Sequence, residues 1–142
     1  MAKKEIKNMA ENAEHEHLHS AEQQEKMIRS NMLEQDAGQI EQQLVMIEQQ
    51  IAELQNLKIA LGEIEKAKEK DEILASLGKN IFIRTALLSK DLLVNVGAKT
   101  AVKKTASEVQ EIIDRDLIKI SQVREQLAKE FERIVLEMQK LA

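Results

Sequence analysis

Two stretches of the chain carry apolar residues at alternating spacings of four and three, and this spacing restricts the possible folds. The first seam consists of Leu33, Ala37, Ile40, Leu44, Ile47, Ile51 and Leu54. The second consists of Ile113, Leu117, Ile120, Arg124, Leu127, Phe131, Ile134, Met138 and Leu141. Such an alternation places every member on one side of a helix and is the pattern of a left-handed coiled coil. We therefore expect two long helices, each with one apolar stripe.

The two seams are nearly equal in length, which favours one antiparallel hairpin within the chain over two unrelated zippers. We expect helices over 31–70 and 106–142, and Thr105 followed by Glu108 predicts a capping box at the start of the second. Arg124 interrupts the second seam. Two interpretations remain open for it: the guanidinium reaches out to a neighbouring Glu, or the charge fixes the register at some cost in stability.

The residues between the helices, 72–104, favour strands over helix because they contain short β-prone runs. These runs are 72–77, 81–86, 92–96 and 100–104. A three-residue connection containing Gly78 joins the first two, and one containing Gly97 joins the last two, as in β-hairpins. The predicted fold class is therefore mainly α: a long antiparallel α-helical coiled-coil hairpin with two β-hairpins between the helices.

The predicted hairpins also suggest assembly. A two-stranded hairpin alone is marginal in water, and apolar strands with open edges favour pairing with another chain. We expect an oligomer interface at the apolar residues of this segment, which are Ile73, Leu74, Ile81, Phe82, Ile83, Leu92, Val94, Val96 and Val102. Oligomerisation is the firmest functional inference from the residues alone.

Composition argues against several other classes of protein. The chain has no cysteine, so disulfides and cysteine-based metal sites are excluded. Its net charge of −4 and its two aromatic residues disfavour a nucleic-acid-binding arm. The longest apolar run, 44–47, is far too short to cross a membrane, and the N-terminus has no apolar core of a secretory signal. We expect a cytoplasmic protein without nucleic-acid or membrane partners.

Residues 1–30 are polar and are expected to form an extension, either disordered or a frayed helix, ahead of a domain at 31–142. Within the extension, His15, Glu16 and His19 match the H-E-x-x-H pattern of zinc proteases. Such an enzyme also needs a third ligand and a walled cleft, which this segment does not offer. A solvated tail is the preferred interpretation, with adventitious metal binding as the alternative, and we expect no catalytic residue, metal site or cofactor.

The order helix, two hairpins, helix resembles the alpha-class subunit of prefoldin, over about residues 31–142. The most specific stretch is 92–99, which is similar to that family's V-x-V-G-A-G hairpin, and it is followed by the basic segment 102–108. The second hairpin distinguishes alpha-class from beta-class subunits. This chain departs from the family pattern in having no proline, in Gly97-Ala98-Lys99 replacing the Gly-x-Gly turn, and in its N-terminal extension.

The resemblance implies a non-enzymatic, ATP-independent holding chaperone. In that family two alpha-type and four beta-type subunits form a hexamer by joining their hairpins. The coiled-coil tips hold non-native client proteins, which then pass to a group II chaperonin. A structural or scaffolding coiled coil that holds no client is the alternative function.

A holding chaperone needs exposed apolar surface, and helix ends are where a coiled coil can open. Flexible methionines suit contact with many different partners. The expected client-binding residues stand near the start of the first helix and the end of the second: Met27, Ile28, Met32, Leu33, Ile134, Val135, Leu136, Met138 and Leu141. For the seam positions among them, which are Leu33, Ile134, Met138 and Leu141, ordinary packing is the other interpretation.

Overall fold

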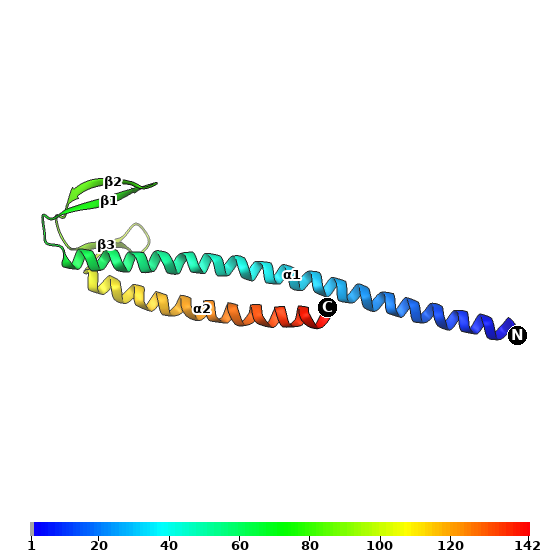
Figure 1. The fold of residues 1–142 in the computed structure, drawn as a ribbon. Coiled ribbons are helices and arrows are strands. Elements are labelled where there is room, and N and C mark those ends of the chain that lie inside the picture. The colour runs from blue at the N-terminus through cyan, green and yellow to red at the C-terminus, as the bar shows by residue number, and fades with distance from the viewer. Residues whose placement is uncertain (1) are drawn as a thin grey trace. The chain divides into compact units, whose positions relative to one another are not determined.

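The computed structural model describes residues 2–142 and has the order helix, four strands, helix (Figure 1). The elements are α1 (Ala2–Lys66), β1 (Glu72–Gly78), β2 (Ile81–Ala86), β3 (Leu92–Asn95), β4 (Ala101–Lys104) and α2 (Ala106–Leu141). Two long helices in contact, with two β-hairpins between them in the chain, confirm the predicted fold class. The chain divides into two compact units, and α1 and α2 each contribute to both.

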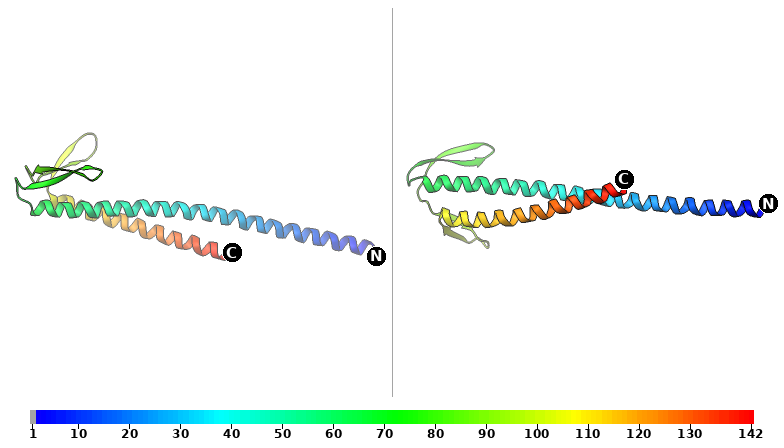
Figure 2. Two further views of the ribbon diagram at one scale, coloured as in Figure 1. Left: turned by 45° about the horizontal axis from the view of Figure 1, so that its top comes forward. Right: turned by 60° about the horizontal axis from the view of Figure 1, so that its bottom comes forward.

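The first unit joins the part of α1 up to Val45 to Glu125–Ala142. In both views of Figure 2 the C-terminal end of α2 lies beside α1. The buried core there consists of Leu33, Ile40 and Ile134. Partly buried seam residues pack against this core: Ala37, Leu44, Leu127, Phe131, Met138 and Leu141. Every core residue of this unit comes from the two seams, so the spacing of four and three correctly identified the packed faces.

The second unit, Met46–Arg124, contains the hairpins and a core of its own. Leu61, Ala106 and Ile113 are buried there, and Leu92 of β3 packs against them. The helix α2 begins with a cap, because the backbone amide of Glu108 donates a hydrogen bond of 3.2 Å to Oγ1 of Thr105. The Thr105 half of the predicted capping box is therefore confirmed, while the carboxylate of Glu108 lies 4.0 Å from Nζ of Lys104.

The helix α1 ends at Lys66, four residues before the expected boundary at 70. The next residues form a turn, in which the backbone amide of Lys68 donates to Oδ2 of Asp71 at 2.9 Å and Lys70 has a φ of 74°. A side-chain acceptor that captures a backbone amide competes with the helical hydrogen bond. The ammonium of Lys90 then donates to the carbonyl oxygen of Glu65 at 2.9 Å, where the end of the helix favours a cation.

Both hairpins are antiparallel and form separate two-stranded sheets. In the first, Ser76 is opposite Phe82, and in the second Val94 is opposite Val102. Gly97 begins the second turn with a φ of 102°, a backbone conformation that residues with a side chain rarely adopt. The two turns stand at the glycine-containing connections expected from the sequence.

The polar extension is helical in the structure, since α1 begins at Ala2. All described residues before Ser30 are exposed. The division of the chain into an extension, 1–30, and a domain, 31–142, stays a prediction.

Candidate functional site

The expected client-binding residues all belong to the first unit, and the structure places them in two different environments. Met27, Ile28, Met32 and Leu136 are exposed, at 67%, 61%, 60% and 57% of their full accessible surface. Leu33, in contrast, is only 7% exposed. The reason is helical geometry, since successive residues are rotated by about 100° around the axis. Met32 therefore points away from the seam although its neighbour Leu33 lies in it.

The seam residues of the expected set are packed. Leu33 and Ile134 belong to one buried core, and Ile134 is 2% exposed. Met138 and Leu141 are half-buried against the same core. For these four residues the structure agrees with the packing interpretation, and their contact with clients stays a prediction.

A hollow on the surface of α2 lies beside the exposed Leu136. It has a volume of about 310 Å³ and is lined by Phe131, Glu132, Val135 and Leu136. Three of these four side chains are apolar, so the hollow extends the apolar surface around Leu136. Phe131 holds a seam position, and that position gave no sign that its ring would also line a surface hollow.

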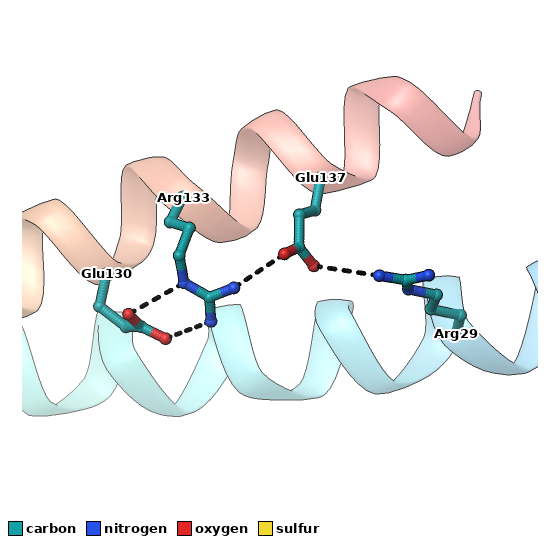
Figure 3. Close-up of polar contacts among 4 residues, drawn as sticks. All are labelled: Arg29, Glu130, Arg133 and Glu137. Carbon is teal, nitrogen blue, oxygen red and sulfur yellow. Dashed lines mark hydrogen bonds and ion pairs between the residues drawn. The ribbon is translucent and has the colours of Figure 1, made fainter.

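A chain of charged residues connects α2 to α1 within the first unit (Figure 3). The guanidinium of Arg133 donates to Glu130 and, at 2.8 Å, to Glu137. Glu137 in turn lies 3.9 Å from Arg29 of α1. The hydrogen bond from Arg133 holds the pKa of the Glu130 carboxyl below its usual value, and the same bond raises the pKa of Arg133. The network links the two helices of the first unit through one ion pair.

The hairpins present the second candidate surface. Most of the expected interface residues are exposed, among them Leu74 and Phe82 at 65% and 58%. Three of the expected residues are half-buried, Ile73, Leu92 and Val94, and Leu92 packs against the core of its own unit. Three further apolar residues of this segment are exposed and were not among those expected at the interface: Leu77, Leu88 and Leu93. Leu77 belongs to β1 and Leu93 to β3, whereas Leu88 lies outside the strands.

The histidines of the extension are exposed on α1. Within residues 2–142 no group of three or more His, Cys, Asp or Glu side chains is placed to hold a metal ion. No helix among these residues is long and apolar enough to span a membrane.

Comparison with known proteins identifies the family of the chain. The family model described as "Prefoldin subunit" matches residues 33–142. The curated protein "Prefoldin subunit alpha" of Methanosphaera stadtmanae is 31% identical over 86 residues, which are 61% of this chain and 62% of that protein. The aligned part therefore spans less than two thirds of that relative.

A second "Prefoldin subunit alpha", from Thermofilum pendens, is 21% identical over 112 residues, covering 78% of this chain and 87% of that protein. The solved structure of filamentous PFD from Methanocaldococcus jannaschii covers 84% of this chain and 93% of its own at 14% identity, with a TM-score of 0.49. The two curated matches confirm the resemblance to alpha-class subunits. Because the family model matches more than half of its residues, this chain belongs to the prefoldin subunit family, whose members are non-enzymatic chaperone subunits.

Proposed function

We propose that this chain is the alpha-type subunit of an ATP-independent holding chaperone that binds non-native proteins at the first unit. The observation that carries the proposal is the group of exposed apolar side chains there, Met27, Ile28, Met32 and Leu136. Each exposed apolar contact contributes about 25 cal/mol per Å² when a client covers it. No catalytic group is required, because retention depends on covering surface that would otherwise drive aggregation.

The exposed and the packed residues have different roles in this proposal. Met27, Ile28, Met32 and Leu136 contact the client, and the hollow beside Leu136 accepts an apolar client side chain. Leu33 and Ile134 hold the two helices together and so keep the exposed residues in place. Methionines suit this task because their flexible thioether chains adapt to differently shaped partners.

The second unit supplies assembly. The hairpins form two-stranded sheets with open edges, and they expose apolar residues such as Leu74 of β1 and Phe82 of β2. We propose that these hairpins join beta-type subunits in a hexamer of two alpha and four beta chains in the cytoplasm. Several weak client contacts then act together, which raises retention through effective concentration. A group II chaperonin is the proposed recipient of the held protein.

The test is suppression of aggregation of a chemically denatured enzyme, without ATP, by the assembled complex. The client-contact variant carries Met27→Ser, Ile28→Ser, Met32→Ser and Leu136→Ser. The control variant carries Ile59→Ser and Ile118→Ser in the second unit, at residues that are 64% and 60% exposed. We expect the first variant to lose suppression while native mass spectrometry shows an unchanged assembly, and the control variant to retain both. Equal activity in all three complexes would contradict the proposed site.

A scaffolding subunit is the rival function, and it shares the same fold. Its assembly would depend on the hairpins, but the assembled wild-type complex would not delay aggregation at a near-stoichiometric ratio. The wild-type arm of the experiment therefore separates the two functions, and the variant arm locates the site.

A further inference from the structure

We propose that His15 and His19 of α1 form a two-ligand site for one transition-metal ion, of the class of Zn²⁺, Ni²⁺ or Cu²⁺. Both residues lie on a continuous helix and are exposed. Residues four apart stand one above the other on a helix, with their Cβ atoms about 5–6 Å apart. Two imidazoles in that arrangement can bind one ion between them.

The position of His17 makes the site specific to one face of the helix. At about 100° per residue, His15 and His19 are separated by only about 40° around the axis, whereas His17 is about 200° from His15. The three histidines therefore form one pair and one isolated residue. In the structure Nε2 of His19 lies 3.5 Å from the side-chain amide nitrogen of Gln23, a contact long enough to be weak and to be replaced by a metal ion.

The charges around the pair favour a cation. No Lys or Arg occurs between Asn8 and Glu25, whereas this stretch contains the carboxylates of Glu11, Glu14, Glu16, Glu22 and Glu25. At about 100° per residue, Glu11 and Glu22 fall on the same face as the histidine pair. Their negative charge raises the local concentration of cations, although carboxylates alone would equally favour Mg²⁺ or Ca²⁺. The imidazole pair is what selects transition metals.

A site with two protein ligands is not a protease centre. Water fills the remaining coordination positions, and an exposed helix provides no cleft to exclude solvent around a substrate. The consequence is structural. The segment from Ala2 to Arg29 is exposed throughout, so packing adds little to its helicity, and helices held by propensity alone are marginal. An ion that both imidazoles bind across one helical turn binds the helical form more tightly than the unfolded segment and so stabilises the extension by linkage.

Calorimetric titration of the tag-free full-length chain with zinc chloride tests the site. We expect one ion per chain, no binding of Mg²⁺ at the same concentrations, and weaker binding at acidic pH, since protons compete for the imidazoles. The His15→Ala and His19→Ala variants should each lose affinity by about tenfold or more, because the second ligand no longer acts intramolecularly. The His17→Ala variant is the matched control and should bind like the wild type.

Hydrogen exchange of the same proteins provides a second readout. With zinc at 100 times its dissociation constant, exchange of amides around residues 11–22 should slow by up to about 100-fold in the wild type and in the His17→Ala variant. The His15→Ala variant should show no slowing. Equal loss of zinc affinity in all three histidine variants would overturn a site formed by His15 and His19. Binding of half an ion per chain, together with a doubled mass in light scattering, would overturn it as well. Zinc binding without slower exchange would overturn the proposed stabilisation.

Discussion

The guanidinium of Arg124 in α2 donates a hydrogen bond of 3.1 Å from Nη1 to Oε1 of Glu48 in α1. Arg124 occupies a seam position at which its neighbours along the stripe are apolar, and its side chain remains 43% exposed. The guanidinium therefore lies at the edge of the seam, where it contacts a carboxylate of the opposite helix. This supports the interpretation in which the residue reaches out to a glutamate.

Replacing Arg124 with leucine should stabilise the helix pair. An ion pair of this exposure contributes about 0–1 kcal/mol, whereas a well-buried leucine contributes about 1.5–3 kcal/mol. We expect the Arg124→Leu variant to gain about 1 kcal/mol in free energy of unfolding, measured by urea denaturation. A loss of stability, or a mixture of helix registers in cross-linking, would show that the ion pair with Glu48 instead specifies the alignment.

The buried Ile134 should be far more sensitive to truncation than its exposed neighbour. It is 2% exposed and packs in the core that contains Leu33. We expect Ile134→Ala to cost about 3 kcal/mol, because it removes buried methyl groups and leaves a cavity. Leu136→Ala is the control and should change the free energy of unfolding by less than about 0.5 kcal/mol, as is usual for surface positions. A similar loss in free energy of unfolding in both variants would contradict the assignment of Ile134 to the packed face of α2 and of Leu136 to its exposed face.

The pattern of the sequence was sufficient to predict two long helices and two hairpins, because the spacing of four and three, the β-prone runs and the glycine-containing connections all reflect local geometry. The same spacing separated Leu33 and Ile134, which lie on the seams, from Met32 and Leu136, which lie off them. It was not sufficient to decide whether the seam residues near the helix ends are packed or open, because that depends on where the opposite helix lies. The end of α1 at Lys66 also required information that periodicity lacks, namely the hydrogen bond between Asp71 and the amide of Lys68.

The second hairpin should become more stable when position 99 of its turn carries glycine, as in the Gly-x-Gly turn of the family pattern. Lys99 has a φ of 59°, a conformation that costs a residue with a side chain about 1–2 kcal/mol. Part of this gain is offset by the greater freedom of glycine in the unfolded chain, about 0.5–1 kcal/mol. We therefore expect Lys99→Gly to stabilise the hairpin by about 0.5 kcal/mol. Slower exchange of the Thr100 amide, which donates to the carbonyl oxygen of Gly97 at 2.9 Å, would report it.

The opposite substitution in the same turn is the control. Gly97 has a φ of 102°, so Gly97→Ala should destabilise the hairpin and speed exchange of the Thr100 amide. Faster exchange of the Thr100 amide in the Lys99→Gly variant would indicate that the lysine side chain stabilises the hairpin by more than its strained backbone destabilises it.

The ion pair between Glu130 and Arg133 should be detectable as a pH dependence. The pKa of Glu130 is lowered in the folded chain by the hydrogen bond from Arg133. A lowered pKa means that the carboxylate adds stability above the usual glutamate pKa of about 4.3, and that this contribution is lost as the pH falls through the lower folded value. In an NMR titration the Glu130 carboxyl should titrate below its usual value. Arg133→Gln should move it back up, and an unchanged titration would contradict the pair.

Client contact is tested most directly by site-specific photo-crosslinking in the assembled complex. A photoreactive amino acid is placed at position 27 or 136 in the first unit, or at position 59 or 118 in the second, where Ile59 and Ile118 are comparably exposed. A chemically denatured, labelled enzyme is then added without ATP. We expect crosslinks to the client from positions 27 and 136 and few from 59 and 118. Equal crosslinking at all four positions, or crosslinking confined to 59 and 118, would contradict capture at the first unit.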